Sequence, residues 1–251
     1  MSGLLRYARY QLTDFLAQRL SLPLLLLAFV AALPTYMMAK HSAPDFMQTQ
    51  MGANLAKQMF AQSITLFLPI GAFVGSVGVM STDRQQGYVR FLFSKPVGVV
   101  AYYAQAFALH AALFVALFGA VVWGFSRYTI HFSVHRSMEA AALTFLLIGG
   151  VGFLLGALTR LDSALLLVLY LAGLILQQLV ATPNGLPNGG LPAWLAILAR
   201  VLPPALPLDH VRDALYAGTA VDMGDFWHVA LYGAGAGVLG LIALRRAPLA
   251  R

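Results

Sequence analysis

The sequence predicts an all-α polytopic membrane protein, with residues 1–251 forming a single transmembrane domain. Hydrophobic residues make up 60% of the chain and charged residues 10%, whereas soluble proteins carry about 25% charged residues. The apolar residues also gather in runs of roughly 17–25 residues, which is the length a helix needs to cross a bilayer. Segments of strand length in which apolar and polar residues alternate are rare, so the pattern argues against a β-barrel.

Six of these runs are predicted to be transmembrane helices. An even number of crossings places both termini on one side. That side receives ten of the 16 Lys and Arg residues and three of the nine acidic residues, so it carries the whole net charge of +7. Because basic residues concentrate in the cytoplasm, both termini are predicted to be cytoplasmic, in the cell inner (cytoplasmic) membrane. The predicted spans are Leu20–Met38, Met59–Met80, Val97–Phe125, Met138–Leu158, Ala164–Ala181 and Phe226–Leu244.

Composition also excludes several functions. The chain has no Cys, so disulfides, thiolate metal sites and cysteine nucleophiles are excluded. The basic charge is explained by topology and by attraction to anionic lipid. No basic cluster with interleaved aromatic residues suggests base stacking, so nucleic acid is not an expected partner.

The first predicted element is an interfacial amphipathic helix within residues 1–19. Its apolar residues recur at helical spacing on one side, and its polar residues lie on another. Such a helix either anchors the chain at the membrane surface or contacts a partner. The apolar side comprises Leu5, Ala8, Leu12, Phe15 and Leu16, and the polar side Arg6, Arg9 and Thr13.

Three predicted spans carry pairs of glycines four residues apart, namely Gly71 and Gly75, Gly152 and Gly156, and Gly233 and Gly237. Small residues at this spacing let helix backbones approach closely inside a membrane. They indicate a tightly packed bundle and provide a possible dimer face.

Between the fifth and sixth spans, residues 191–218 predict a hairpin of two short helices. The first follows Pro192, a residue favoured at the start of a helix. After a proline-rich break, Asp209 is a natural N-cap and Gly218 a natural C-terminal stop. Neither helix is long enough to span, so the hairpin is predicted to cover the outer end of the bundle.

A polar segment, residues 81–96, joins the second and third spans. Thr82 and Gln85 have the spacing of a capping box. Tyr88 and Phe91 share one helical face, and Pro96 limits any continuation. The pattern predicts a short rigid helix that can pass a displacement from a separate protein into the two adjoining spans.

This segment resembles a signature of ABC type-2 transporter permeases. Asp83-Arg-Gln-Gln-Gly-Tyr88, followed by Leu92-Phe-Ser-Lys-Pro-Val97, is similar to the coupling helix that docks into the ATP-binding subunit in that family. The segment from Leu202 to Gly218 resembles the family's second signature, in which a proline, an arginine and a glycine precede the last span. The chain departs from the family pattern by Asp83 for Glu, Tyr88 for Thr, and Gly98-Val99 where Ser-Arg is common. The resemblance implies docking through Asp83, Arg84, Gly87, Tyr88, Arg90 and Phe91.

The resemblance further implies partners. None of the chain's three lysines forms the Gly-Lys-Ser/Thr of a phosphate-binding loop, so no cofactor is expected in this chain and it is not itself an enzyme. ATP and Mg would bind two ATP-binding-cassette ATPase subunits. A second permease copy or a paralogue would complete the pathway, and an extracytoplasmic accessory protein is a further possible partner. The implied function is a permease that forms the translocation pathway, with export as the expected direction.

Polar residues inside the predicted spans are candidates for lining this pathway, because polarity in hydrocarbon is costly. The alternative for each is a hydrogen bond to a neighbouring helix. In the hairpin, Trp194 and Arg212 are candidates for a gate. The candidates within the spans are Gln62, Gln105, His110, Gln177 and Gln178.

A copper site is an alternative interpretation of His131, His135, Met47 and Met51, since thioether and imidazole ligands suit copper. Met is also a common apolar filler, and no metal is assigned from the sequence. This alternative corresponds to a branch of ABC type-2 systems that serves copper-enzyme maturation and acts on an extracytoplasmic partner.

Other classes remain as rivals. A membrane-embedded enzyme would need a catalytic motif, and the chain has no Gly-x-Ser-x-Gly, no His-Glu-x-x-His and no intramembrane carboxylate pair. A secondary transporter would be expected to show an inverted repeat. A non-transport membrane assembly protein would need no ATPase, and this requirement distinguishes it from the permease.

Overall fold

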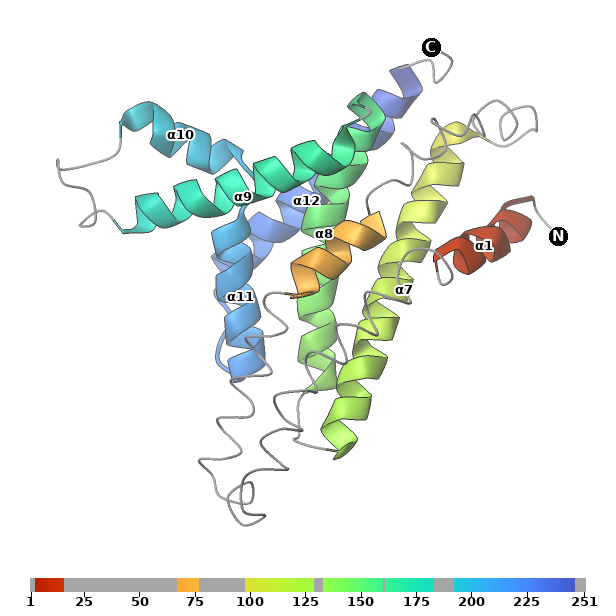
Figure 1. The fold of residues 1–251 in the computed structure, drawn as a ribbon, viewed down its shortest axis with the longest axis horizontal. Helices are drawn as coiled ribbons and strands as arrows, with labels where there is room; N and C mark the ends of the chain where they lie inside the picture. Colours follow the sequence, from red (N-terminus) through yellow and green to blue (C-terminus); the bar gives the residue numbers. More distant parts are fainter. Residues whose placement is uncertain are drawn as a thin grey trace.

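The computed structural model describes residues 3–15, 67–76, 98–128, 133–159, 161–182 and 192–246, and all regular secondary structure in these ranges is helical (Figure 1). A short apolar helix at Phe67–Ser76 is drawn in orange. The labelled helices are α1 (Gly3–Asp14), α7 (Val99–Tyr128), α8 (Val134–Leu158), α9 (Asp162–Ala181), α10 (Ala193–Val201), α11 (Ala205–Ala217) and α12 (Met223–Arg246).

Four of the described helices, α7, α8, α9 and α12, are long and apolar enough to cross a membrane. They coincide with the last four predicted spans, so the prediction of a helical membrane protein is confirmed for this part of the chain. The first predicted span lies outside the described residues, and the second is described over 67–76 alone.

Three of the described spans, α8, α9 and α12, begin earlier than predicted, and polar residues cap the starts of α8 and α12. The Ser133 hydroxyl accepts a hydrogen bond from the Arg136 N–H, so α8 begins at Val134 rather than at Met138. The Asp222 carboxylate accepts the Gly224 N–H at 2.7 Å at the start of α12. Hydropathy alone misses these turns because it ignores side chains that satisfy the free N–H groups of a first turn.

The centre of the bundle is the crossing of α8 and α12, which glycine makes possible. A Cβ on Gly150 would lie 2.1 Å from the Gly233 carbonyl oxygen. Further along, a Cβ on Gly240 would lie 2.7 Å from the Phe153 ring. The predicted role of Gly233 in close packing is therefore confirmed, but its partner on α8 is Gly150. Gly152 instead faces α9, where a Cβ would lie 3.1 Å from Leu166.

Aromatic side chains join α7 to α8 and α1 to α7. The rings of Phe114 and Phe145 lie 5.3 Å apart between α7 and α8. The Phe15 side chain, just after α1, is fully buried, and its ring lies 4.7 Å from that of His110. The predicted amphipathic helix therefore forms over Gly3–Asp14, with its apolar end against α7.

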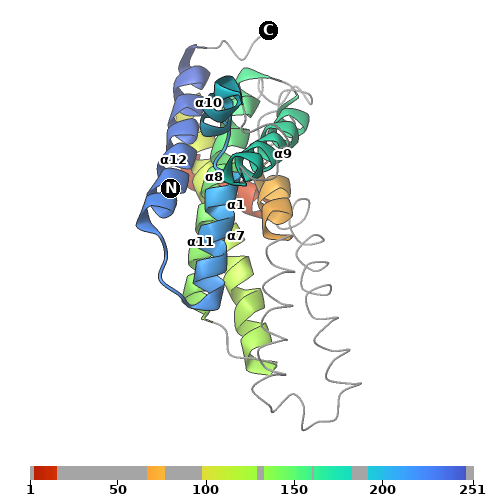
Figure 2. The same ribbon diagram turned by 90° about the vertical axis from the view of Figure 1, so that its left-hand side faces the viewer.

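Helix α9 runs across the direction of α7 and α8, with α10 beside it (Figure 1). Helix α11 then packs against α8 and α12 (Figure 2). At the far end of α11, Arg136 of α8 donates a hydrogen bond to the Thr219 carbonyl at 3.4 Å. Much of α9 is exposed and apolar, as expected of a helix that faces lipid. Its exposed residues include Leu165, Leu167, Val168, Leu171, Ile175, Leu179 and Val180.

The predicted start of α11 was wrong. The helix begins at Ala205 with Pro204 at its N-cap position, four residues before Asp209. Pro207 is tolerated because it lies in the first turn, where N–H groups have no helical partner. The predicted end is confirmed, since Gly218 adopts the left-handed conformation (φ 75°) that stops the helix.

Candidate functional site

The break between α10 and α11, residues 202–204, is held by one side chain of α9. The Gln177 amide nitrogen donates hydrogen bonds to the carbonyls of Ala199 and Pro203, both at 3.0 Å. Its amide oxygen accepts the Leu206 N–H at 2.9 Å. One glutamine thus satisfies polar groups at the end of one helix and at the start of the next.

The chemistry of proline explains why these groups need an external partner. A helical carbonyl normally bonds to the N–H four residues on, and for Ala199 that residue is Pro203, which has no N–H. The Val201 carbonyl also lacks its usual helical partner, because the Ala205 N–H donates to the Pro203 carbonyl instead. The Tyr232 hydroxyl of α12 donates a hydrogen bond to the Val201 carbonyl at 2.8 Å. The break is therefore tied to two helices that are able to span a membrane.

Glycine lets the break approach α9. A Cβ on Gly173 would lie 2.7 Å from the Pro203 carbonyl oxygen. Gly173 precedes Gln177 by one helical turn, so both residues lie on one face. Any side chain at position 173 would push the break away from the glutamine that satisfies it.

The same face of α9 extends to a buried charge. Arg212 of α11 has a relative exposure of 1% and is paired with Asp209, one turn earlier. Tyr170 of α9 interacts electrostatically with Arg212. Because Tyr170, Gly173 and Gln177 are spaced by three and four residues, one stripe of α9 holds both the break and the arginine. We call this stripe, the break and the Asp209–Arg212 pair the hairpin anchor.

Burial dominates the electrostatics of the hairpin anchor. Desolvation raises the pKa of Asp209, and the attraction of Arg212 opposes this rise. Desolvation also raises the pKa of Tyr216, which keeps its hydroxyl neutral. Arg212 Nε and Nη1 and the Tyr216 hydroxyl are buried and have no hydrogen-bond partner in this part of the structure. A buried arginine with spare donors can donate hydrogen bonds to a further anionic or carbonyl group.

The structure brings together only some of the predicted site residues. Gln177 and Arg212 belong to the hairpin anchor, whereas Trp194 is exposed on α10 and Gln178 is exposed on α9. Gln105 and His110 lie on α7, where His110 is buried against Phe15. Other predicted site residues lie outside the described ranges, namely Gln62, Asp83, Arg84, Gly87, Tyr88, Arg90, Phe91, His131, Met47 and Met51.

Of the four residues considered for copper, the structure describes His135. Its ring nitrogen lies 3.1 Å from the Glu139 carboxylate on the exposed start of α8. Within the described ranges, no three His, Asp or Glu side chains gather closely enough to hold a metal ion.

Sequence reasoning missed Tyr170, Gly173 and Tyr232. A usable signal was present for the first two, because a tyrosine, a glycine and a glutamine at helical spacing form one polar and narrow stripe on an apolar helix. No comparable signal marks Tyr232, whose partner is a backbone carbonyl.

The chain matches no protein-family model and no curated protein.

Proposed function

We propose that this chain is the permease subunit of an ABC type-2 transporter in the inner membrane. It would form the translocation pathway, with export as the direction, together with a second permease copy or a paralogue. Two separate ATP-binding subunits would bind ATP and Mg and drive it. The signatures at Asp83–Val97 and Leu202–Gly218 support this proposal, as do the four described helices that are able to span a membrane.

The hairpin anchor is the observation that carries the proposal. Helices α10 and α11 have 9 and 13 residues, too few to cross about 30 Å of hydrocarbon. Their break satisfies its backbone groups inside the protein, as non-helical backbone at membrane depth requires. A short hairpin fixed to the helices before and after it can close the end of a pathway and still move with them.

In this proposal, a push from the ATPases enters through the segment around Arg84 and Phe91. The adjoining spans carry it through the bundle, in which α8 and α12 pack closely at their glycine crossing. Arg212 holds the hairpin in its closed position, and exposed Trp194 faces the lipid or the second permease. Gln62, Gln105, His110 and Gln178 remain pathway candidates.

The test is to co-express the chain with its genetic neighbours and to ask whether an ATPase co-purifies with it. In vesicles containing the complex, we expect Arg84→Ala and Phe91→Ala to lower the rate of ATP hydrolysis by the complex, because the ATPase no longer docks on the permease, while both proteins remain in the membrane. The matched control is Arg9→Ala, which removes an exposed arginine from α1. The proposal fails if no ATPase binds or if both docking variants hydrolyse ATP as the control does.

A further inference from the structure

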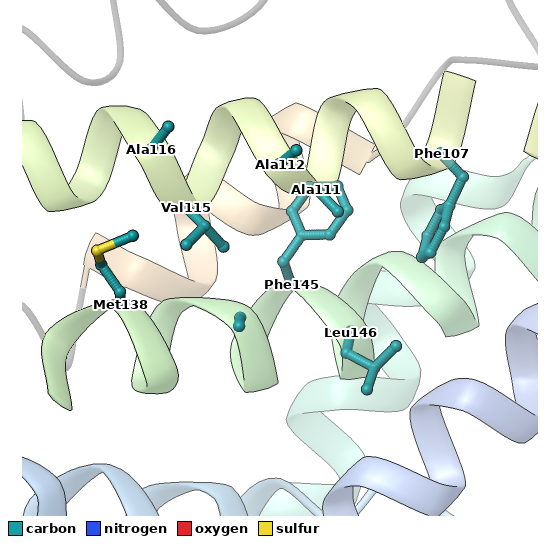
Figure 3. A pocket seen from close by; sticks show the side chains of 9 residues that line it. Phe107, Ala111, Ala112, Val115, Ala116, Met138, Phe145 and Leu146 are labelled. Atoms are coloured by element: carbon teal, nitrogen blue, oxygen red, sulfur yellow. The ribbon is translucent and has the colours of Figure 1, made fainter. Parts of the chain in front are cut away.

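The contact between α11 and the start of α12 includes a side chain whose charge can change near neutral pH. The Nδ1 atom of His210 on α11 lies 3.2 Å from an oxygen of the Asp225 carboxylate on α12. These residues are 15 positions apart, so the contact joins the hairpin to the last span. The apolar cavity between α7 and α8 is a contrasting contact, because the side chains that line it include none that titrates (Figure 3).

The strength of the contact between α11 and α12 depends on the protonation of the imidazole. A histidine side chain ordinarily changes charge between about pH 5 and pH 8. A protonated imidazole attracts a carboxylate by its charge, whereas a neutral imidazole offers a hydrogen bond alone. The side chains of His210 and Asp225 are 59% and 29% exposed. The pair therefore exchanges protons with the solvent without any opening of the fold.

The other charged residues beside His210 lie on its own helix. Asp209 is paired with Arg212. Burial raises the pKa of Asp209, and the nearby charges of Arg212 and His210 oppose this rise. Asp213 is exposed. Because all three residues belong to α11, they move with His210 when the hairpin moves and do not tie it to α12.

On α12, two further titratable residues flank Asp225 in the sequence. The Asp222 carboxylate accepts the Gly224 N–H at the start of the helix. His228 is exposed. Both belong to α12 itself, so the charge that links the two helices is that of His210.

The contacts that the structure describes between α11 and the other helices packed on it use groups that keep their charge near neutral pH. Arg136 of α8 donates to the Thr219 carbonyl at 3.4 Å, just beyond the end of α11, and arginine stays protonated. From α9, Tyr170 interacts with Arg212, and a tyrosine hydroxyl is ordinarily neutral at this pH. Gln177 of α9 contacts the Leu206 N–H through an uncharged amide. A change of pH near neutrality therefore acts on the hairpin chiefly through its contact with α12.

We propose that His210 and Asp225 form a proton-dependent latch, which holds the hairpin against α12 at low pH and loosens as the pH rises. The sequence predicts that the hairpin lies at the outer end of the bundle, where the latch would respond to the pH outside the cytoplasm. As a regulator of transport, the latch rests on the proposed permease function. As a contact between two helices, it can be measured without an ATPase.

The test is hydrogen exchange of the full-length protein in phospholipid nanodiscs, followed by mass spectrometry at about pH 5.5 and about pH 8.5. At each pH, the exchange rate of the α11 amides in Asp225→Asn is divided by that in the wild type, which cancels the chemical effect of pH on exchange. Asparagine keeps a hydrogen-bond acceptor and removes the charge. We expect a ratio of about two to four at the lower pH, because an exposed ion pair stabilises modestly, and a ratio near one at the higher pH.

Two variants and an internal reference control this measurement. In a His210→Gln background, Asp225→Asn should leave the exchange of α11 unchanged at both pH values. His228→Gln, which removes an exposed histidine of α12, should keep the pH dependence of the wild type. The internal reference is the stretch of α7 along the cavity, because the residues that line this cavity include none from α11 or α12. Its ratio should stay at one.

Equal α11 ratios at the two pH values would overturn the latch. A pH-dependent ratio that survives in the His210→Gln background would also overturn it, because another group would then be responsible. Failure of an ATPase to co-purify would overturn the permease function and would leave the exchange ratios unaffected, so the two failures are distinguishable.

Discussion

The Ala199 carbonyl accepts a hydrogen bond from Gln177 at 3.0 Å, across 22 residues of sequence. It needs this distant donor because position 203, four residues on, is a proline. Pro203, between α10 and α11, thus leaves the Ala199 carbonyl without a helical donor, and Gln177 of α9 supplies the donor. Stability of this region should therefore depend on α9 as much as on the hairpin itself.

Replacing Gln177 by Ala tests this dependence. The variant leaves two carbonyls and one N–H of the break without their partner. We expect it to lower the free energy of unfolding by about 1–3 kcal/mol. Thermal unfolding in detergent, followed by tryptophan fluorescence, measures the change. Gln178→Ala is the matched control, since its side chain is exposed, and a similar loss in both variants would contradict the assignment.

A double-mutant cycle tests the role of proline. In Pro203→Ala, residue 203 gains an N–H that the Ala199 carbonyl can accept. Gln177→Ala should therefore destabilise the Pro203→Ala background less than the wild type, by about 0.5–1.5 kcal/mol, the worth of one hydrogen bond. Unfolding of the two single variants and the double variant gives the coupling. If the losses in unfolding free energy of the two single variants simply add up in the double variant, Pro203 is not the reason why the Ala199 carbonyl needs Gln177.

The crossing of α8 and α12 should not tolerate a methyl group. In Gly150→Ala the new Cβ would lie 2.1 Å from the Gly233 carbonyl oxygen, so the backbones must separate. We expect a loss of about 1–3 kcal/mol from overpacking. At Gly235, on the same crossing helix, a Cβ meets nothing within 4 Å. Gly235→Ala should be neutral or stabilising, because alanine favours helix, and equal losses would rule out the contact as the cause.

The buried pair of Asp209 and Arg212 should be coupled. Asp209→Leu leaves a guanidinium that is 1% exposed without its carboxylate, and breaking such a pair costs about 3–5 kcal/mol. Adding Arg212→Met removes the stranded charge and should recover much of that loss. Unfolding of single and double variants measures this recovery, with exposed Asp213→Asn as the control. A double variant less stable than Asp209→Leu would contradict the coupling.

The pKa of Asp209 also predicts a pH dependence. Burial raises this pKa, so the folded protein holds the proton more tightly than the unfolded chain, in which the pKa is about 3.9. The stabilising contribution is complete below that value and is lost as pH rises through the folded-state pKa. Unfolding temperatures of wild type and Asp209→Asn, compared between about pH 4 and pH 7, should show the wild type losing relative stability as pH rises. Parallel profiles would contradict the shift.

Hydropathy sufficed to predict the helical membrane class and the approximate positions of α7, α8, α9 and α12, because run length and apolar content are local properties. It did not place the starts of α8 and α11, which depend on Ser133 and on the tolerance of a first turn for Pro207. The end of α11 at Gly218 was predictable because the left-handed backbone conformation that ends many helices favours glycine.

The hairpin anchor was harder to predict, because its contacts join distant residues. Gln177 and Arg212 stood out as polar residues in apolar surroundings. Gln177 bonds to backbone groups, and the amino-acid sequence does not show which backbone groups a side chain will contact. Gly173 has a purely steric role, visible only when the Pro203 carbonyl is placed 2.7 Å from its missing Cβ.

The three contacts of Gln177 have a mechanical consequence. A hinge needs backbone groups that can change partners, and at this break Gln177 and Tyr232 already hold the carbonyls of Ala199, Val201 and Pro203. Releasing them would leave these carbonyls without a partner, at a cost of about 1–3 kcal/mol for each buried group. The junction is therefore expected to be rigid. A tilt of α9 would move α10 and α11 together with it as one rigid unit.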